Sequence, residues 1–246
     1  MLSKNETKYI KSLSHKKHRD EERLLIAEGP KLTEEILKSD FIIKHVYATK
    51  EWLRGHSEIA APATEISEVE LTNISNLQTA NEVLVIAEQK VLRNEPVVLN
   101  SITLALDGIQ DPGNFGTIIR IADWFGIKQI VASEDSVEEY NPKVVQSTMG
   151  SICRVDVWYK DLQQWIEQMN IPVYGALLNG QNVYELKGIK EGLLVIGNEA
   201  KGIREPLKSK IIHPVTIPKR GGAESLNAAV ATGIIVGCMV NGSLSH

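Results

Sequence analysis

Three short segments of the chain combine glycine with amide, carboxylate or hydroxyl side chains directly after an apolar run. They span residues 107–116, 195–203 and 217–227. Glycine lets the backbone approach a ligand closely, and amide and acid groups can hydrogen-bond to that ligand. We therefore expect the three segments to form a ligand-binding or catalytic site built from loops.

The first segment leads into a predicted helix that carries Arg120. Asn114 is suited to the N-cap of this helix, whose free N–H groups would favour a phosphate. Arg120 lies between Ile119 and Ile121, and an arginine in such an apolar setting needs an acid or a bound phosphate as its partner. Both a structural ion pair and a phosphate contact fit this pattern.

The second and third segments carry further polar groups. Gly197, Asn198 and Glu199 follow an apolar run, where an amide and a carboxylate suit hydrogen bonding to a ligand, although a helix cap would use the same residue types. Ser225 is predicted to cap the long helix that follows the third segment. This helix has small residues at four-residue steps, which allow either a ligand or another backbone to approach closely.

The elements that position these segments alternate between strand and helix from residue 102 onward. The predicted strands are 102–106, 129–132, 173–177, 193–196 and 215–217. The predicted helices are 115–125, 143–149, 162–169, 204–208 and 226–240. This alternation implies an α/β fold with a mostly parallel sheet covered on both faces, and its ligand site should lie outside the carboxyl ends of the strands.

The first part of the chain predicts a smaller α/β module. Apolar residues at helical spacing favour helix through 9–38 with a break at Gly29-Pro30, and strands are predicted at 41–48 and 83–87. The polar stretch that follows contains a proline and predicts a domain boundary near residue 96. We therefore expect two domains, 1–95 and 96–246.

Composition is that of a globular protein, the length fits one large domain or two modest ones, and a membrane protein is not expected. The 246 residues are 43% apolar and 24% charged, and no uncharged apolar run is long enough to span a bilayer. The polar N-terminus does not look like a signal peptide, so a cytoplasmic location is expected. Cys153 and Cys238 lie far apart among apolar residues, which favours free buried thiols.

Charge is distributed unevenly along the chain. The net charge is −4, but residues 1–23 hold seven Lys or Arg residues against four acids. A basic arm on an acidic body can attract phosphates, and Lys16, Lys17 and Arg19 are the candidates for RNA binding. A solvated helix face would have the same composition, so both interpretations stay open.

Several other site classes are missing from the sequence. The first segment has two glycines at the right spacing but lacks the complete G-x-G-x-x-G pattern of dinucleotide-binding folds. There is no G-x-x-x-x-G-K-[ST] phosphate loop and no G-x-S-x-G nucleophile elbow. The six histidines show no metal-ligand spacing, so no metal is expected.

Taken in order, the three segments resemble the three motifs of the SpoU family of RNA 2'-O-ribose methyltransferases, part of the SPOUT superfamily. The matching residues are 111–116 with Arg120, 197–199 with Gly202, and 217–218 with 225–227. The resemblance covers residues 102–240. Residues 28–31, with the basic segment before them, look like the substrate-binding module that precedes this domain in many members.

This resemblance implies more than the spacing can show. It implies a sheet with a deep C-terminal trefoil knot, preceded by an N-terminal domain that binds the RNA substrate. It also implies S-adenosylmethionine as the cofactor and a homodimer whose active site uses residues of both chains. The cofactor neighbours carried over by motif are Leu177, Gly197, Asn198, Ile217, Leu226 and Asn227.

The resemblance also assigns catalytic roles. Arg120 is proposed in the family as a general base, but a guanidinium stays protonated, which favours stabilisation of the forming alkoxide and a grip on the adjacent phosphate. Asn114 would position the ribose, and Glu199 and Asn227 would orient Arg120 or the nucleotide. Ser225 would bind near the reacting phosphate or cap its helix. Neither a membrane nor a metal is an expected partner.

Two alternatives to a ribose methyltransferase of ribosomal or transfer RNA remain. The first is a non-catalytic RNA-binding protein that kept the fold, and the intact set of polar motif residues argues against it. The second is a base methyltransferase of the same superfamily, such as the guanine-N1 type. The pairs Asn114 with Arg120 and Ser225 with Asn227 favour the ribose, and the separate N-terminal module favours ribosomal RNA over transfer RNA.

Overall fold

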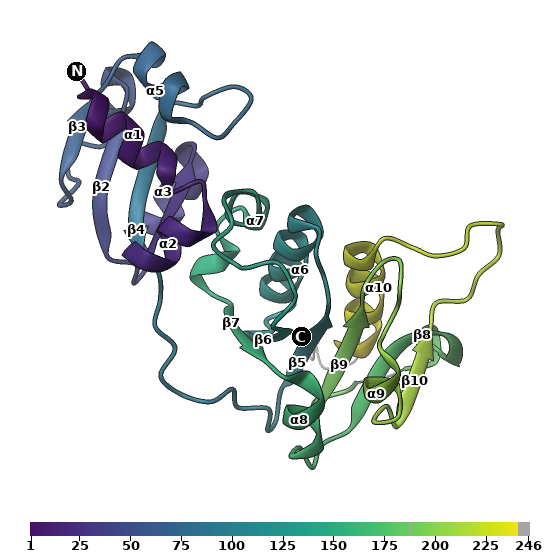
Figure 1. Cartoon of the computed structure of the whole chain (residues 1–246). Coiled ribbons are helices and arrows are strands. Elements are labelled where there is room, and N and C mark those ends of the chain that lie inside the picture. Colours follow the sequence, from purple (N-terminus) through teal and green to yellow (C-terminus); the bar gives the residue numbers. More distant parts are fainter. Residues whose placement is uncertain (187, 241–246) are drawn as a thin grey trace. The chain divides into compact units, whose positions relative to one another are not determined.

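The computed structural model describes residues 1–186 and 188–240, and the chain divides into two compact units (Figure 1). Unit 1 comprises 1–91 together with 138–153, and unit 2 comprises 92–137 together with the chain from Arg154 onward. The first division lies close to the boundary expected near residue 96. No sequence pattern had pointed to the inclusion of 138–153 in unit 1.

Unit 1 contains a four-stranded sheet with the strand order β1-β4-β2-β3. Its strands are β1 (Leu24–Glu28), β2 (Ile43–Ala48), β3 (Ala63–Glu65) and β4 (Val83–Glu88). Its helices are α1 (Lys4–Ser12), α2 (Lys16–Glu22), α3 (Pro30–Leu37), α4 (Lys50–Gly55), α5 (Glu68–Ile74) and α7 (Pro142–Thr148), followed by the 3-10 turn η1 (Ser151–Cys153). Strand β4 is antiparallel to β1 and β2, whereas β2 and β3 are parallel.

The prediction of helix through 9–38 is wrong in its middle part, because β1 lies there. Arg23 adopts a left-handed conformation that ends α2, and the next residues enter the sheet. Leu24 and Ile26 pack into the hydrophobic cluster on one face of the sheet, and Leu25 and Ala27 pack into the cluster on the other. A strand covered on both faces shows no alternation of polar and apolar residues, so its sequence cannot be told from a helix by periodicity.

Unit 2 is built on a six-stranded sheet with the strand order β10-β8-β9-β5-β6-β7. Its strands are β5 (Ile102–Asp107), β6 (Gln129–Ser133), β7 (Asp156–Lys160), β8 (Val173–Asn182), β9 (Gly192–Gly197) and β10 (His213–Thr216). Its helices are α6 (Pro112–Trp124), α8 (Leu162–Glu167), α9 (Glu205–Lys208) and α10 (Ala228–Val240), with the 3-10 turn η2 (Val183–Glu185) after β8. All pairings between these strands are parallel, which confirms the predicted α/β architecture.

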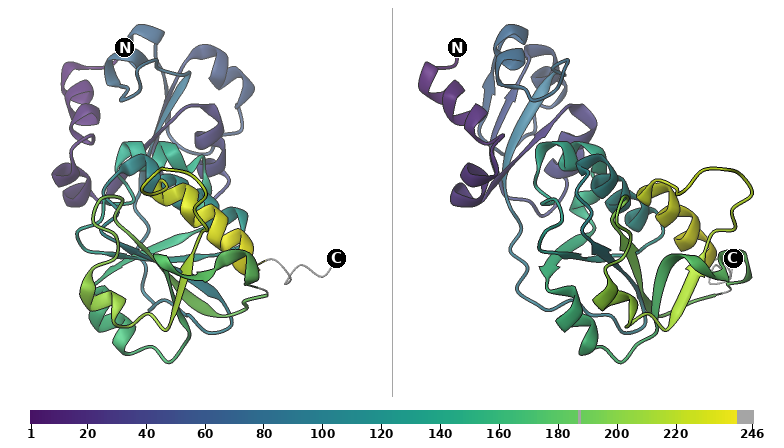
Figure 2. Two further views of the ribbon diagram at one scale, coloured as in Figure 1. Left: turned by 90° about the vertical axis from the view of Figure 1, so that its right-hand side faces the viewer. Right: turned by 45° about the vertical axis from the view of Figure 1, so that its right-hand side comes forward.

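The helices of unit 2 cover both faces of its sheet. Figure 2 shows α6 and α10 side by side on one face, and α8 and α9 lie on the other. On the second face Leu162 and Trp165 of α8 and Leu207 of α9 pack against apolar residues of β5, β6 and β9. Strand β7 was not predicted, because it is a short edge strand with charged ends and a single buried residue, Val157. No helix in the described ranges has the length and apolar character needed to cross a membrane.

Candidate active site

The three motif segments follow the carboxyl ends of β5, β9 and β10. Asp107 ends β5, Gly197 ends β9 and Thr216 ends β10. Because the strands are parallel, these ends lie at the same edge of the sheet, where α/β proteins usually bind their ligands. The fold therefore places the three loops so that their side chains can meet.

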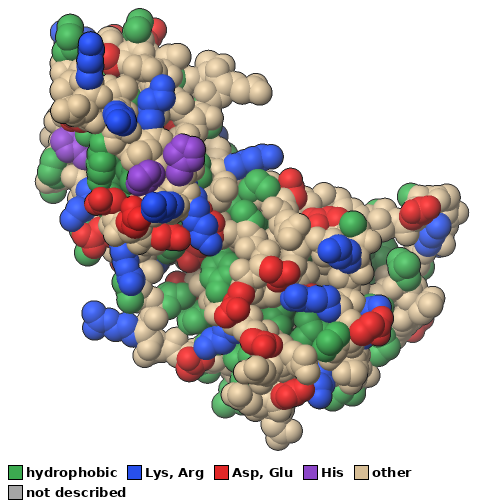
Figure 3. All heavy atoms as spheres, viewed as in Figure 1, with side chains coloured by type: hydrophobic (Ala, Val, Ile, Leu, Met, Phe, Trp, Pro, Cys, Tyr) green, Lys and Arg blue, Asp and Glu red, His purple; other side chains and the backbone are tan. Residues whose placement is uncertain are grey.

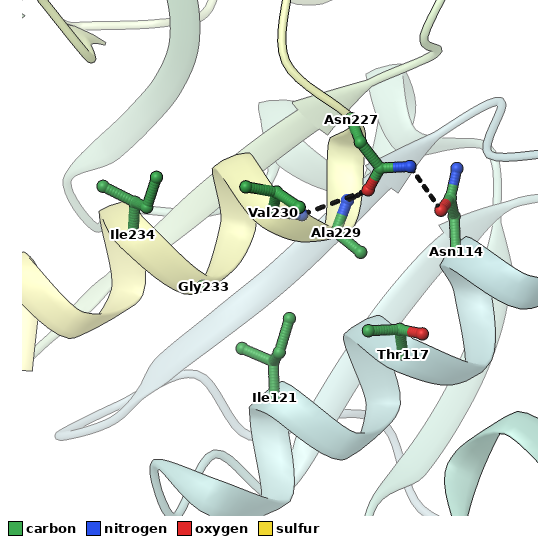
Figure 4. A pocket seen from close by; sticks show the side chains of 8 residues that line it. All are labelled: Asn114, Thr117, Ile121, Asn227, Ala229, Val230, Gly233 and Ile234. Atoms are coloured by element: carbon green, nitrogen blue, oxygen red, sulfur yellow. Dashed lines mark hydrogen bonds between the residues drawn. The ribbon is translucent and has the colours of Figure 1, made fainter.

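A chain of hydrogen bonds connects one residue of each motif. The Asn227 Nδ2 donates to the Asn114 Oδ1 at 2.8 Å, and the Asn114 Nδ2 donates to the Glu199 Oε1 at 2.6 Å. Figure 4 shows Asn114 and Asn227 turned toward one another from α6 and α10. Three of the five catalytic candidates thus lie in direct contact, although the residues are up to 113 positions apart.

The helix caps differ from the sequence prediction. Asp111, not Asn114, caps α6, since its side chain accepts from the Asn114 N–H at 2.7 Å. Asn227, not Ser225, caps α10, since its Oδ1 accepts from the Ala229 and Val230 N–H groups. Helix α6 begins a few residues earlier than expected, and helix α10 begins a few residues later. The consequence is that the Asn114 amide is free to join the motifs, and Ser225 lies in the exposed loop before α10.

Arg120 is exposed on α6 and has no hydrogen-bond or ion-pair partner within residues 1–186 and 188–240. The structural ion pair considered from the sequence is therefore not formed there. Helical geometry turns Arg120 by roughly 120° from Asn114, whereas Thr117 and Ile121 lie on the same side as Asn114. The guanidinium is thus available for a ligand, a phosphate or a second chain.

Gly197 and Asn198 determine the conformation of the second motif loop. A Cβ added at Gly197 would lie 2.3 Å from the backbone of Gly202 and Ile203, so the loop folds back over a position that only glycine fits. The Asn198 Nδ2 donates to the Gly108 carbonyl at 2.8 Å, and its Oδ1 accepts from the backbone of the following turn. The Asn198 side chain therefore joins the first two motif loops, and its backbone carbonyl closes the second loop by accepting from the Gly202 N–H at 2.8 Å.

The pairing of β8 is interrupted near Leu177, one of the expected cofactor neighbours. Strand β8 pairs with β9 only over Val173–Gly175, and its pairing with β10 shifts from Gly175 to Gln181, so 176–180 lies outside both ladders. Leu177 in this stretch is partly exposed, and so is Ile217 after β10. Backbone groups released from a sheet beside apolar side chains suit a ligand that has both a purine ring and polar hydrogen-bonding groups, as S-adenosylmethionine does.

Leu226 is nearly half exposed in the loop that precedes α10, together with Ser225. The structure records no hydrogen bond from the Ser225 hydroxyl to another residue of the described chain. These two residues therefore remain sequence-based candidates. Their loop follows Ile217 directly and returns to Asn227, which belongs to the hydrogen-bond chain of the three motifs.

An ion pair that the sequence analysis had not singled out fixes the end of the second motif. Asp107 is buried, and it accepts from the Arg204 backbone N–H at 2.8 Å and from the Arg204 Nε at 2.5 Å. The hydrogen bond between the two side chains is the main cause of the raised pKa of Arg204. The sequence could have indicated this ion pair, because Asp107 is the last residue of a buried apolar strand and a buried carboxylate needs a partner.

The basic arm contains one residue that the sequence placed wrongly on the surface. Arg19 is only 1% exposed, and its guanidinium donates to the carbonyls of Leu13 and Ser14 and to the Glu138 carboxylate. Burial is the main cause that lowers the pKa of Arg19. Its bonds are therefore used inside unit 1 and are not available to RNA, because a buried cation must be paired.

The other two RNA-binding candidates, Lys16 and Lys17, are exposed on α2. Figure 3 shows Lys and Arg side chains on this face of unit 1, interspersed with histidines and acids. Lys17 lies 3.9 Å from Glu21 in an exposed pair, which is worth little energy and can be replaced by a phosphate contact. Among the residues that the structure describes, no group of three or more His, Cys, Asp or Glu side chains could hold a metal ion.

Comparison with known proteins agrees with this arrangement. The model of the SpoU rRNA Methylase family matches residues 101–237, and that of the MRM3-like substrate binding domain matches 4–85. The 23S rRNA (guanosine(2553)-2'-O)-methyltransferase RlmP of Bacillus subtilis is 31% identical over 234 residues, covering 92% of each chain.

Two solved structures resemble the chain over nearly its whole length. One is a protein assigned to the TrmH family of RNA methyltransferases from Porphyromonas gingivalis, with a TM-score of 0.86, 38% identity, and coverage of 97% of this chain and 98% of that one. The other is the AdoMet-bound rRNA methyltransferase from Sinorhizobium meliloti, with a TM-score of 0.84, 29% identity, and coverage of 97% and 96%. The chain belongs to the SpoU rRNA methylase family and carries an MRM3-like substrate-binding domain at its N-terminus.

Proposed function

We propose that this protein transfers the methyl group of S-adenosylmethionine to a ribose 2'-hydroxyl of ribosomal RNA. The hydrogen-bond chain from Asn227 through Asn114 to Glu199 carries the proposal, because it joins all three motifs at one edge of the sheet. The 2'-O-methyltransferase RlmP and the AdoMet-bound structure from Sinorhizobium meliloti support the reaction and the cofactor.

The polar residues of the site have distinct tasks in this reaction. The cofactor supplies a methyl group that its sulfonium activates, so the protein must align the hydroxyl and stabilise its oxygen as the proton leaves. Arg120 stabilises the developing negative charge and holds the neighbouring phosphate. Asn114 is held between Glu199 and Asn227, and its amide retains a second N–H for the ribose.

In our proposal the cofactor binds against Leu177, Gly197, Ile217 and Leu226, beside the stretch of β8 that leaves the strand pairing. The segment 217–227 leaves β10 and returns to α10, and in our proposal it closes over the cofactor as part of a deep trefoil knot. The parallel order β10-β8-β9 and the close approach of Pro214 to Gly180 support a tightly threaded chain, since a Cβ at Gly180 would lie 2.6 Å from the Pro214 carbonyl.

Gly197→Ala is expected to weaken binding of S-adenosylmethionine at least about tenfold. The added methyl group would meet the backbone of Gly202 and Ile203 at 2.3 Å, so the loop that bears the cofactor contacts must move. Titration calorimetry of the purified protein measures the affinity. Gly55→Ala is the matched control, because nothing lies within 4 Å of a Cβ there, and wild-type affinity in Gly197→Ala would contradict the placement.

We also propose that α6 and α10 form the interface of a homodimer. An apolar groove of about 380 Å³ runs between them, and its walls include Ile121, Val230 and Ile234 (Figure 4). Val230 is 51% exposed and Trp124, at the end of α6, is 84% exposed. A second copy is the natural occupant of an apolar face that borders Asn114 and Asn227, since a symmetric dimer would bring both active sites to it.

Val230→Glu is expected to weaken this dimer at least about 30-fold, because it would bury an unpaired carboxylate in the interface. Sedimentation velocity over a range of protein concentrations measures the association. Ile212→Glu is the control, because Ile212 is also an exposed apolar residue of unit 2 but lies outside the groove. A wild-type protein that sediments as a monomer, or a Val230→Glu variant that stays dimeric, would contradict the interface.

The reaction itself is tested by incubating the purified protein with unmethylated ribosomal RNA and methyl-labelled S-adenosylmethionine. Digestion to nucleosides should release a labelled 2'-O-methylnucleoside. A label on the base would show a base methyltransferase, and absence of both label and cofactor binding would show an RNA-binding protein without activity.

Replacing Lys16 and Lys17 by alanine should raise the KM for RNA and reduce the dependence of this KM on salt concentration.

A further inference from the structure

A second cavity of about 380 Å³ lies in unit 2, at the carboxyl ends of β6 and β7. It is lined on one side by Leu162, Pro206 and Leu207, which are apolar residues of α8 and α9. Polar groups face it from Ser133, Asp135 and Arg204. Seven of the ten lining residues are polar or charged, and Leu162 and Leu207 are almost fully buried, so the cavity suits a ligand that is held mainly by hydrogen bonds.

This cavity adjoins the catalytic loops directly. Ser133 accepts from the Gly108 N–H at 2.8 Å, and Gly108 belongs to the first motif segment. A Cβ built on Gly108 would lie 3.7 Å from the Asp135 Oδ2 and 3.9 Å from the Asn198 Cβ, so this one residue separates the cavity from the second motif. Arg204, which lines the cavity, directly follows the second motif segment at the N-cap of α9, so the cavity adjoins both motif segments.

The Asp135 carboxylate retains capacity for a ligand. Its two oxygens lie 3.4 Å from the Arg204 Nη1 and Nη2, and hydrogen bonds of that length are weak. The side chain of Asp135 is 54% exposed, and that of Arg204 is 50% exposed. A hydrogen bond from Ser133 is the main cause that lowers the pKa of Asp135, so the carboxylate is ionised at neutral pH and can only accept.

The charges of the cavity favour a neutral ligand with hydrogen-bond donors. Glu134 and Asp161 also line it, and their charges oppose a phosphate. Lys160, which lines it as well, is paired with Glu95 at 2.5 Å. A planar group that offers two adjacent donors to Asp135 and an acceptor to Arg204 would satisfy both exposed side chains.

We propose that this cavity holds the base of the methylated nucleotide and that Asp135 and Arg204 select guanine. Among the four RNA bases, only guanine has two neighbouring donors, N1–H and the N2 amino group, beside an acceptor, O6. Asp135 accepts from the two donors, and Arg204 donates to O6. The base stacks against Pro206, which is the exposed apolar residue of the lining, and the ribose extends toward Asn114. This inference rests on the proposed ribose methylation.

The test begins with wild-type protein and unmethylated ribosomal RNA, in which the 2'-O-methylated nucleotide is mapped. Synthetic RNA of the mapped region is then made with inosine, which lacks the N2 amino group, in place of the target guanosine. Wild-type protein is expected to prefer guanosine over inosine about tenfold or more in kcat/KM. In Asp135→Ala this preference should fall to within about twofold, while the affinity for S-adenosylmethionine stays unchanged.

Glu191→Gln is the matched control, because Glu191 is a carboxylate of unit 2 that accepts from the Asn100 N–H outside the cavity. It should keep the wild-type preference for guanosine. A mapped nucleotide other than guanosine, or an Asp135→Ala variant that still prefers guanosine tenfold, would overturn the inference. Failure of the wild-type protein to methylate any ribose would instead overturn the proposed function, so the two failures are distinguishable. Asp135→Glu keeps a carboxylate at this position. It should therefore retain part of the preference for guanosine that Asp135→Ala loses.

Discussion

Arg120→Ala is expected to lower the rate constant of methyl transfer at least about 100-fold and to leave the affinity for S-adenosylmethionine within a few-fold of the wild type. Arg120 has no partner within the described chain and is exposed on α6, so its loss breaks no interaction that stabilises the fold. Its positive charge acts on the oxygen only when the hydroxyl loses its proton, and a group that acts in the transition state affects the rate and not the binding of the cofactor.

Single-turnover kinetics with saturating RNA measures the methyl-transfer step, and calorimetry measures cofactor affinity. Arg120→Lys separates charge from geometry, because an ammonium keeps the charge but loses the planar fork of donors, so an intermediate rate is expected. Lys128→Ala removes another exposed cation of unit 2 that has no partner in the described ranges, and it should behave like the wild type. Near-normal turnover of Arg120→Ala would show that the role assigned to this residue is wrong.

The parts of this protein that sequence could predict are those that depend on local pattern. Apolar runs that end in a glycine or a polar residue marked β5, β9 and β10 and placed the motif loops at their carboxyl ends. Because parallel strands end at one edge, the prediction that the loops converge followed from the strand assignment alone. The hydrogen bonds of Asn114 with Glu199 and Asn227 agree with that prediction, since they join residues of all three loops.

The parts that sequence could not predict depend on contacts between distant residues. The position of Asp111 one residue before α6 decides which side chain caps the helix, and helix boundaries cannot be read that finely from a pattern. From the sequence alone Arg19 is one more cation of the basic arm, because its partner Glu138 lies 119 positions away. The same distance explains why the inclusion of 138–153 in unit 1 was not anticipated.

Glu138→Ala is expected to destabilise unit 1 by about 3–5 kcal/mol, because it would leave the Arg19 guanidinium buried without a counter-charge. Arg19 is 1% exposed and its Nε has no hydrogen-bond partner among the described residues, so the carboxylate is the main compensation for this charge. Hydrogen exchange of β1 and β4, measured by mass spectrometry on the full chain, reports the local free energy of opening in unit 1.

A double variant shows whether the destabilisation comes from the unpaired charge of Arg19 or from a simple loss of packing. Arg19→Met with Glu138→Ala removes both charges, and it should exchange more slowly in β1 than Glu138→Ala alone, because no uncompensated cation remains buried. Glu134→Ala is the control, since Glu134 is an exposed carboxylate with no partner in the part of the chain that the structure describes. If β1 is equally well protected in Glu138→Ala and Glu134→Ala, the buried ion pair does not stabilise unit 1.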